Sequence, residues 1–374
     1  MSIEIVARLR SAVIDPLKTR FVERDEVIDL IALATVAGEH LFLFGPPGTA
    51  KSALIRHFAL AVDGRYFEYM LTRFSEPNEI FGSVDIARLR DGVVATVTTG
   101  MLPEAEFAFL DELFNANSAI LNNLLTVLNE RVYRRGAETH RLPLLSLFSA
   151  SNHLPEDDAL KALFDRFLLR CHVDNLRREA MPRLLRAGWE LERAAPAPAV
   201  VSADDLRALG ALVLDVNLEP IRELYMEVIF KVRDLGIALS DRRAVKVLKL
   251  LAASAVLCGR SAVEASDLWV LRYVWDRAEQ ITPLRALVQG VLEQHPSAAA
   301  HPRAATVERV DGEELARQLD ALERELETAG RSLTSLARLR EWLTDLTDRA
   351  AWVPDQAARN HLLQRGGQLL RRLG

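Results

Sequence analysis

The sequence predicts a layered α/β domain followed by an all-helical region, and three observations support this fold class. A short apolar run at residues 40–44 (HLFLF) stops at a glycine-rich turn, after which a helical pattern begins near Lys51. Further strand-like segments, separated by helical patterns, continue to about residue 175. Beyond that residue the strand signals nearly disappear, and helical stretches rich in Leu, Ala and Arg follow. Strands that alternate with helices are typical of a parallel sheet between two layers of helices, a three-layer αβα core.

The elements of the α/β part are predicted in chain order. Residues 3–17 and 26–36 have the apolar spacing that indicates helices. The apolar run at 40–44 is predicted to be a buried parallel strand, because it is short and ends at a turn signal. The remaining strands are expected at residues 66–71, 107–110 and 144–150. Together these segments place the α/β domain at residues 1–175.

The helical region is divided by a break rich in Pro and Ala. A lid-like all-helical domain is predicted at residues 176–294, and a linker at 295–310, where the sequence HPSAAAHPRAAT lies. A helical tail is predicted at residues 311–374. Leucines recur at helical spacing from Leu315 to Leu326 and again from Leu336 to Leu346, which predicts a short antiparallel helical appendage.

The composition limits the classes of function. Hydrophobic residues make up 49% of the 374 residues and charged residues 26%, close to the averages of soluble globular proteins. No apolar stretch reaches the roughly 20 residues of a membrane span, so we expect a cytoplasmic protein without an integral membrane segment. The formal net charge of −5 argues against a nucleic-acid partner, although a local basic patch stays compatible with it. Cys171 and Cys258 are predicted to be core thiols, and no metal site made by side chains alone is predicted.

The glycine-rich turn carries what a bound polyphosphate requires. Clustered backbone N–H groups at a helix N-terminus, together with a lysine, attract phosphate. Lys51 is expected to reach the β- and γ-phosphates of a nucleotide, and Ser52 to offer a hydroxyl to Mg²⁺. The alternative is an ordinary turn followed by an ordinary helix start. The predicted phosphate-binding residues are Gly45, Pro46, Pro47, Gly48, Thr49, Ala50, Lys51 and Ser52.

Ala50 departs from the general phosphate-loop motif. The segment GPPGTAKS matches G-x-x-x-x-G-K-[ST] except that Ala50 stands at the last glycine. A methyl group at this position is expected to require a negative φ, because positive φ is sterically unfavourable for residues with a Cβ.

Two adjacent acids follow a second predicted strand. Residues 107–110 (FAFL) lead directly into Asp111 and Glu112. Since the carboxyl ends of parallel strands meet at one edge of the sheet, the acid pair is expected beside the phosphate loop. Asp111 is predicted to hold Mg²⁺ through its water shell, and Glu112 to polarise the attacking water. Alone the pair also fits a strand that ends in solvent, but with the upstream loop it predicts a nucleotide hydrolase.

Two further side chains are placed where they can assist hydrolysis. Asn152 ends the apolar segment at residues 144–152, and its amide is predicted to hold the water without adding charge. The alternative is an Asn that opens a turn before Pro155. Arg166, in the segment LFDRF, follows a predicted helix at the rim of the domain. An arginine there can serve the γ-phosphate of a neighbouring subunit.

The order of these motifs resembles that of an AAA+ ATPase, and more narrowly of a MoxR-type ATPase close to the group called regulatory ATPase variant A. The resemblance extends over about residues 5–290. In this group the phosphate loop often ends in Ala-Lys-Ser, so Ala50 fits the family. The segments that carry the resemblance are FVERDEVIDLIALATVAGEHLFLFGPPGTAKS, FEYMLTRFSEPNEIFGSVDI, GMLPEAEFAFLDELFNANSAILNNLLTVLNER, SASNHLP, LFDRF and SDRRAVKVLKLLAASAVLCGRSAVEASDL.

The resemblance implies ATP and Mg²⁺ as cofactors and assigns roles to single residues. Arg242, in the segment SDRR of the helical lid, is implied as a second sensor that reaches the nucleotide. Arg243 is an alternative second sensor, and Arg170 an alternative finger. Asp111 and Glu112 are implied as the second acidic motif. Asn152 is implied as the first sensor, and Arg166 as the arginine finger.

Two segments resemble the family's additions to the core. Residues 83–99, with a turn signal at Asp91–Gly92, are predicted to be an insert within the second helix. Residues 130–142, turning at Gly136, are predicted to be a hairpin before the first sensor. In related ATPases such hairpins face the pore of a ring, so the hairpin arginines are either substrate contacts or a solvated basic surface. These arginines are Arg131, Arg134, Arg135 and Arg141.

The leading functional hypothesis is a chaperone-like ATPase that forms a homo-oligomeric ring, hexameric by family expectation. The resemblance implies that it remodels or matures partner proteins with a von Willebrand factor A (VWA) adaptor. The alternatives are a nucleic-acid-dependent motor and an ATP-binding switch without turnover. The acidic charge argues against the first, and the full set of catalytic residues against the second. The resembled group also carries a β-rich module in its tail; this tail is predicted to be helical, so that module and its partner are not expected.

Overall fold

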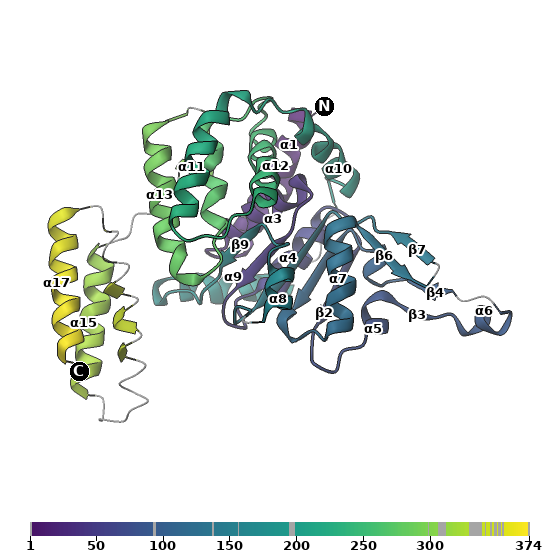
Figure 1. Cartoon of the computed structure of the whole chain (residues 1–374), viewed down its shortest axis with the longest axis horizontal. Coiled ribbons are helices and arrows are strands. Elements are labelled where there is room, and N and C mark those ends of the chain that lie inside the picture. Colours follow the sequence, from purple (N-terminus) through teal and green to yellow (C-terminus); the bar gives the residue numbers. More distant parts are fainter. Residues whose placement is uncertain are drawn as a thin grey trace.

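The centre of the protein is a five-stranded parallel sheet (Figure 1). The strands lie in the order β2-β5-β8-β1-β9. The residues of β5 and β8 are buried almost throughout, as expected for a parallel sheet that is covered by helices on both faces. The computed structural model describes residues 2–92, 95–136, 138–155, 157–193, 199–297, 299–305, 312–328, 339–340, 342–344, 346–347, 350, 353 and 355–372.

The fold class predicted from the sequence is confirmed, and each predicted strand is present. The strand predicted at 144–150 is shifted by two residues at its start. The strands of the central sheet are β1 (Leu41–Phe44), β2 (Tyr66–Met70), β5 (Phe107–Asp111), β8 (Ser146–Ser151) and β9 (Leu169–His172).

The edge strand β9 was not predicted from the sequence. It pairs in parallel with β1, and Leu169 lies opposite Leu41. Its sequence, LRCH, has an arginine at its second position, which interrupts the apolar run that indicates a strand. Arg170 is nevertheless only 1% exposed, because it is neutralised inside the fold.

The helices around the sheet follow the predicted order. The helix predicted at 3–17 is continued to residue 20 through one π-helical turn. The helices of this part are α1 (Ser2–Leu9), η1 (Arg10–Ile14, the π turn), α2 (Asp15–Arg20), α3 (Asp25–Ala37), α4 (Lys51–Ala61), α5 (Pro77–Phe81), α6 (Ile86–Arg90), α7 (Ser118–Glu130) and α8 (Asp158–Phe164), with the 3-10 turns η2 (Leu102–Glu104) and η3 (Leu113–Asn115).

Two small antiparallel hairpins stand out from the sheet (Figure 1). Strands β3 (Ser83–Val84) and β4 (Thr96–Val97) pair with the short helix α6 between them, so the predicted insert is a hairpin with a helical tip. Strands β6 (Val132–Arg135) and β7 (Glu138–Arg141) form the second hairpin. Gly136 follows β6 with a φ of +58°, as the predicted turn requires.

The remainder of the chain is helical, as predicted. Helix α12 packs on α3 and η7, so the helical region and the sheet domain share one hydrophobic core. The elements are η4 (Arg178–Ala180), α9 (Met181–Arg193), α10 (Ala203–Leu212), η5 (Val213–Asp215), η6 (Glu219–Ile221), α11 (Arg222–Asp234), α12 (Asp241–Leu257), η7 (Ala265–Tyr273), η8 (Ala278–Gln280), α13 (Ile281–Gln294), α14 (Pro302–Ala305), α15 (Gly312–Thr328) and α17 (Gln356–Arg372).

The tail has a small core of its own. Leucines of α15 and α17 are buried together with described residues between 339 and 353. Asp320 and Glu323 of α15 pair with Arg365 and Arg372 of α17, respectively, so these two helices run in the same direction. Helix α17 lies within the predicted helical tail, although it was not singled out as an element, and the antiparallel partner predicted at 336–346 begins outside the described residues.

Candidate nucleotide-binding site

The predicted phosphate loop joins β1 to α4 at the carboxyl edge of the sheet. The backbone N–H of Gly45 donates to the carbonyl oxygen of Ser151 at 3.1 Å, which fixes the loop to the end of β8. Strand β5, which ends at Asp111, lies on the other side of β8. The sheet therefore brings the loop, the acid pair and Asn152 to one edge, as the sequence predicted for parallel strands.

The shape of the loop depends on Gly45 and Gly48. A Cβ on Gly45 would lie 2.0 Å from the carbonyl oxygen of Val173, so only glycine fits there. Gly48 has a φ of +78°, a conformation that glycine adopts without steric cost. Where left-handed and right-handed backbone conformations alternate, successive backbone N–H groups point towards one concavity. This geometry binds anions.

Ala50 adopts the conformation that we expected it to avoid. Its φ is +64° and its ψ is +24°, in the left-handed region, so the predicted negative φ is wrong. The last residue before α4 must turn the chain from the loop into the helix. That requirement outweighs the steric cost of the Ala50 methyl group, which is about 1 kcal/mol.

Replacing Ala50 with glycine is expected to stabilise the protein. Glycine has no Cβ to clash in the left-handed region, so the free energy of unfolding of Ala50→Gly should rise by about 1 kcal/mol. Urea denaturation of both proteins measures this difference. The matched control is Ala53→Gly inside α4, where the same change should lower the free energy of unfolding by a similar amount. If both variants lost the same free energy of unfolding, the proposed strain at Ala50 would be contradicted.

Lys51 lies inside the concavity of the loop. Its side chain is 8% exposed, and its ammonium group donates to the carbonyl oxygens of Gly45 and Pro46 at 3.1 and 2.7 Å. It also donates to Oγ1 of Thr49 at 3.2 Å. Burial lowers the pKa of Lys51, while the carboxylates of the acid pair oppose that shift. A buried ammonium group beside inward N–H groups is the donor set that a triphosphate fits.

The acid pair stands at the end of β5. Oδ1 of Asp111 accepts a hydrogen bond from the backbone N–H of Glu112 at 3.0 Å. Burial raises the pKa of Asp111, and Lys51 counteracts the shift. Glu112 has a φ of +53°, a left-handed conformation that is unusual for a residue with a long side chain. Such local strain is characteristic of functional positions.

Asn152 and Ser52 complete this edge. Asn152 follows β8 directly and is exposed, and its Oδ1 lies 2.8 Å from Nδ1 of His153. Ser52 is half-buried in the first turn of α4. The residues predicted for the phosphate loop, the acid pair and the first sensor thus lie together at the carboxyl edge.

Arg24 also belongs to this site, although the sequence did not single it out. Its Nε donates to the carbonyl oxygen of Thr49 at 3.2 Å, and its Nη2 to that of Asp174 at 2.8 Å. It therefore ties the phosphate loop to the segment after β9. Residues 24, 49 and 174 are too far apart in the sequence for any spacing rule to connect them.

Arg242 lies at the opposite, amino edge of the sheet. Helix α7 begins after the acid pair, at the carboxyl edge, and runs back along the sheet to the amino edge. Asn129 lies in the last turn of α7, and its Oδ1 accepts a hydrogen bond from Nη2 of Arg242 at 2.9 Å. Arg131 marks the amino edge, because it donates to the carbonyl oxygens of Gly38 and Leu145, just before β1 and β8. The structure therefore does not bring Arg242 to the phosphate loop of its own chain.

Arg166 lies on the same side as Arg242. The next residue, Phe167, packs its ring on His40, which precedes β1 at the amino edge, with ring centroids 6.0 Å apart. Nη1 of Arg166 donates to Oδ2 of Asp165 at 2.8 Å, and its side chain is 21% exposed. Arg166 is therefore also separated from its own phosphate loop.

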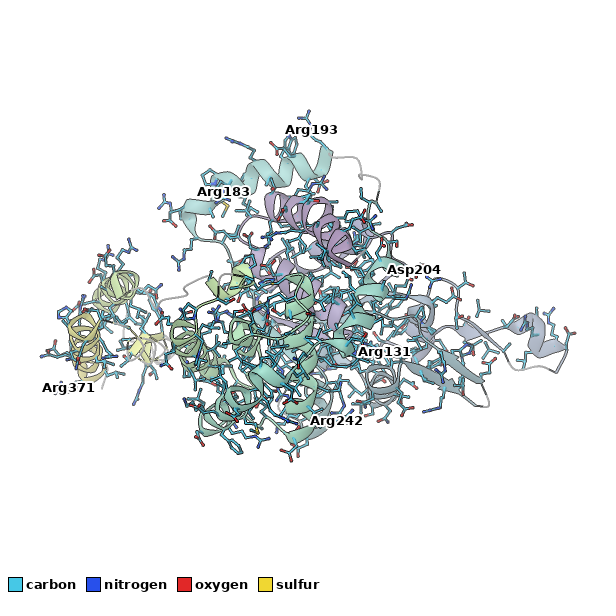
Figure 2. All side chains as sticks on the ribbon, turned by 90° about the horizontal axis from the view of Figure 1, so that it is seen from above. Arg131, Arg183, Arg193, Asp204, Arg242 and Arg371 are labelled. Atoms are coloured by element: carbon cyan, nitrogen blue, oxygen red, sulfur yellow. The ribbon has the colours of Figure 1, made fainter. Side chains whose placement is uncertain are left out.

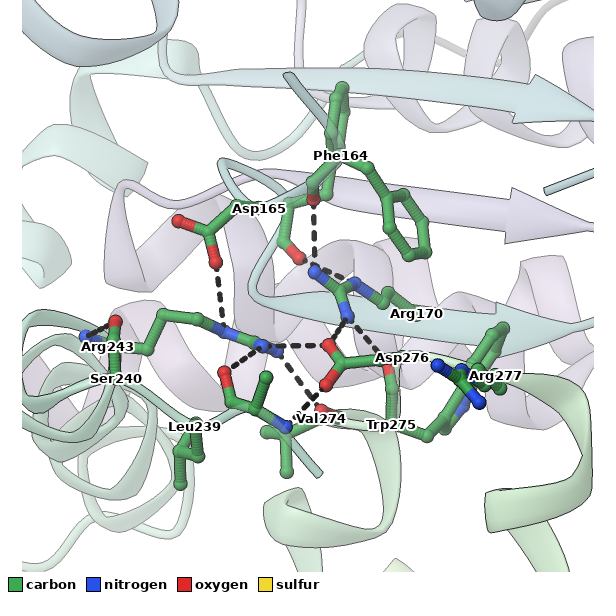
Figure 3. A network of polar contacts seen from close by, with 12 residues as sticks. Phe164, Asp165, Arg170, Leu239, Ser240, Arg243, Val274, Trp275, Asp276 and Arg277 are labelled. Atoms are coloured by element: carbon green, nitrogen blue, oxygen red, sulfur yellow. Dashed lines mark hydrogen bonds and ion pairs between the residues drawn. The ribbon is translucent and has the colours of Figure 1, made fainter. Parts of the chain in front are cut away.

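The alternatives Arg170 and Arg243 are buried in one ion-pair network (Figure 3). Both guanidinium groups donate to Oδ1 of Asp276, and that of Arg243 does so at 2.8 Å. Burial, followed by the charge of Arg243, lowers the pKa of Arg170 to about 9. Asp165 lies 3.7 Å from Arg243 and so connects the network to Arg166. In this arrangement Arg170 and Arg243 join the sheet domain to the helical domain rather than face solvent.

The arginines of the second hairpin mostly have partners in their own chain. Arg131 is half-buried and donates to backbone carbonyls, and Arg134 pairs with Glu130 at 2.7 Å. Arg135 donates to the carbonyl oxygen of Gly82 at 2.9 Å. These contacts connect the second hairpin to its surroundings and leave little of the basic surface considered from the sequence.

A glycine-rich loop on a strand, an acid pair two strands away and a following helical domain define a P-loop protein of the AAA+ class. The comparisons with known proteins identify its family. Residues 7–211 match the family described as the MoxR domain in the MoxR-vWA-beta-propeller ternary systems. Residues 218–288 match an AAA lid domain. The chain belongs to this MoxR family of AAA+ ATPases.

Individual relatives agree with this assignment. An uncharacterised protein of Methanocaldococcus jannaschii is 38% identical over 269 residues, which is 71% of either chain. Chaperone MoxR1 of Mycobacterium tuberculosis is 27% identical over 161 residues, 42% of either chain. In fold, the chain resembles a provisionally designated ATPase from Cytophaga hutchinsonii, with a TM-score of 0.63 and 18% identity. That likeness covers 79% of this chain and 96% of the other.

The finer resemblance to regulatory ATPase variant A is not supported. The matching family is defined by ternary systems with vWA and β-propeller proteins, and two of the named relatives are MoxR proteins. The matches therefore identify the MoxR family but not this subgroup. Among the described residues, none of the helices is sufficiently long and apolar to traverse a lipid bilayer.

Proposed function

We propose that this protein is a Mg²⁺-dependent ATPase whose catalytic site is shared between neighbouring copies in a ring. One observation carries the proposal: the phosphate loop and acid pair lie at one edge of the sheet, whereas Arg166 and Arg242 lie at the other. A single chain therefore holds two halves of a site that do not meet. Two copies placed head to tail bring the halves together, and repetition of that contact closes a ring.

The residues at the carboxyl edge bind and orient the substrate. The backbone N–H groups of the loop and the ammonium group of Lys51 hold the phosphates of ATP, while Ser52 and Asp111 would hold Mg²⁺. Bound Mg²⁺ neutralises the charge that develops on the phosphoryl oxygens. Glu112 accepts a hydrogen bond from the attacking water, and Asn152 orients that water. The ammonium group of Lys51 opposes the rise in the pKa of Asp111 that burial causes.

The neighbour contributes the positive charge that each chain lacks at its own site. In the proposed ring, Arg166 and Arg242 of one copy approach the nucleotide of the next copy. An arginine finger supplied by another chain stabilises the charge of the transferred phosphoryl group. Hydrolysis in one copy then depends on the position of the next, which allows ATP turnover to produce motion.

The proposed biological role is remodelling or maturation of partner proteins together with a VWA-domain adaptor. Two observations support it: the matching family is defined by its vWA partner, and one relative is named a chaperone. Copurification of the full chain, loaded with a slowly hydrolysed ATP analogue, with a VWA-domain protein from the source cells tests the adaptor. Recovery that is equal with and without nucleotide would contradict an ATP-dependent partnership.

The substitution Glu112→Gln is expected to separate binding from hydrolysis. The neutral amide keeps the shape of the side chain but accepts the water proton poorly, so kcat should fall by about 100-fold or more. The affinity for ATP should change little, because Lys51 and the loop are intact. Phosphate release and binding of a fluorescent ATP analogue measure the two properties. Glu130→Gln, at a surface ion pair, is the control and should retain wild-type turnover. Equal turnover in both variants would contradict the role of Glu112.

A further inference from the structure

Helix α9 carries a row of apolar side chains that face solvent. Met181, Leu184, Leu185 and Trp189 recur at the spacing of one helix face, and Leu185 and Trp189 are each 67% exposed. None of the 13 residues of α9 is classed as buried. We call these four residues the α9 stripe. Exposed apolar surface that is continuous along a helix is typical of an interaction site.

The α9 stripe lies on the phosphate-loop side of the molecule. The chain reaches α9 from the carboxyl end of β9, through the segment in which the carbonyl oxygen of Asp174 accepts a hydrogen bond from Arg24. Arg24 in turn bonds to the phosphate loop at Thr49. A protein bound at the phosphate-loop edge would therefore also lie close to α9.

A second exposed apolar surface lies on the side of Arg242. Met226 and Phe230 of α11 are 52% and 62% exposed, and Val245 of α12 is 66% exposed. The two helices are in contact, since the Tyr225 hydroxyl donates to the carbonyl oxygen of Ala244 at 2.5 Å. We call Met226, Phe230 and Val245 the lid patch.

The two surfaces lie on opposite sides of the chain. Figure 2 shows α9, marked by Arg183 and Arg193, at one margin of the molecule and Arg242, at the start of α12, at the opposite margin. A contact between two different patches on opposite sides is heterologous, and this is the kind of contact that closes a ring. The α9 stripe cannot meet the lid patch of its own chain.

The unpaired charges of α9 and α11 differ in sign. Residues 177–193 contain five arginines and three glutamates, and none of them forms an ion pair with a described residue. The cations of α11, in contrast, are neutralised within the chain: Lys231 pairs with Glu227 and Arg233 with Asp241. Glu223 and Asp234 on the exposed face of α11 have no such partner among the described residues. The surplus of unpaired charge is thus positive around α9 and negative on α11, whereas on α12 the partner of Arg242 among the described residues is the neutral amide of Asn129, so Arg242 adds one positive charge.

We propose that the α9 stripe of one copy packs against the lid patch of the next copy in the ring. This inference rests on the proposed function, because the same arrangement brings Arg242 to the neighbour's phosphate loop. A helix of 13 residues is about 20 Å long and about 10 Å wide, so one of its faces covers roughly 200 Å², less than the area of about 800 Å² per partner in a stable interface. The contact therefore adds to the one that the two halves of the catalytic site make. Trp189 is its central anchor, since exposed Trp side chains dominate many interfaces.

Sedimentation of the full chain with an ATP analogue tests the contact. The double variant Leu185→Ser/Trp189→Ser, and separately Met226→Ser/Phe230→Ser, should raise the concentration for half-assembly by at least about tenfold. Both should still bind a fluorescent ATP analogue and should unfold at the wild-type temperature, because the replaced side chains are exposed. Leu214→Ser is the control, since Leu214 is 77% exposed but lies in neither surface.

Cysteine crosslinking identifies the contacting surfaces directly. Trp189→Cys in one chain and Phe230→Cys in another should form a disulfide-linked dimer upon oxidation, and neither single variant should do so alone. Variants that assemble as well as the wild type, with no crosslinked product, would overturn the contact between the α9 stripe and the lid patch. A wild type that stays monomeric with the ATP analogue overturns the ring and the contact together.

Discussion

Arg166→Ala is expected to reduce ATP turnover by about 1,000-fold while leaving ATP binding nearly unchanged. An arginine finger acts on the charge of the transferred phosphoryl group and contributes a factor of about 10³–10⁵ to kcat. Arg166 is well suited to this task, because Asp165 holds its guanidinium at 2.8 Å and its side chain stays partly exposed. Phosphate release under saturating ATP measures the loss, and binding of a fluorescent analogue measures the retained affinity.

Mixing two inactive variants distinguishes a shared site from a site within one chain. Lys51→Ala removes the phosphate contact but keeps Arg166, whereas Arg166→Ala keeps an intact phosphate loop. In mixed rings some Arg166→Ala loops face an intact arginine, so a measurable fraction of turnover should return. Arg56→Ala is the matched control for Arg166→Ala and should retain turnover. Like Arg166, Arg56 pairs with a single carboxylate on the surface, that of Glu68. If the mixture stays inactive while assembled, Arg166 acts within its own chain or not at all.

The sequence was informative wherever a strand ends at a turn signal. The strands that lead to Gly45, to Asp111 and to Asn152 are apolar and short, so their positions follow from periodicity. Their parallel arrangement then places these three ends at one edge. The candidate half of the site that contains the phosphate loop could be placed from the sequence for this reason.

The other half could not be assembled from the sequence, because it depends on which edge each helix reaches. Nothing local to Arg166 or Arg242 indicates that α8 ends, and α12 begins, away from the phosphate loop. The role of Arg24 depends on carbonyl groups 25 and 150 residues further along the chain. The strain at Ala50 depends on how the loop enters α4. Each is a property of tertiary packing, which residue spacing does not encode.

The substitution Asp276→Asn is expected to destabilise the protein by about 3–5 kcal/mol, because it removes the countercharge of two buried arginines. Arg170 and Arg243 are 1% and 2% exposed, and both donate to Oδ1 of Asp276 (Figure 3). The amide keeps the size of the side chain but offers no charge to compensate two guanidinium groups. Urea denaturation at pH 7 measures the change in the free energy of unfolding.

The dependence of this effect on pH has a definite sign. Burial alone would raise the pKa of Asp276, but Arg170 and Arg243 outweigh it and hold the pKa below the usual value for aspartate. A carboxyl with a lowered folded-state pKa stabilises the protein fully above its unfolded pKa of about 4, and the contribution disappears as the pH falls through the folded-state pKa. The difference between wild type and Asp276→Asn should therefore shrink in acid.

A surface carboxylate provides the comparison that isolates burial as the cause. Asp158 pairs with Lys161 at 2.9 Å, but its side chain is 97% exposed. Asp158→Asn should therefore change the free energy of unfolding by less than about 0.5 kcal/mol at any pH. Asp276 follows η7 in the helical domain and pairs with Arg170 of β9 in the sheet. The loss of its charge should therefore also loosen the helical domain from the sheet, and faster hydrogen exchange in α12 would report this loosening. Unfolding of Asp276→Asn at the wild-type urea concentration would show instead that the two arginines are neutralised by other groups, Asp165 first among them.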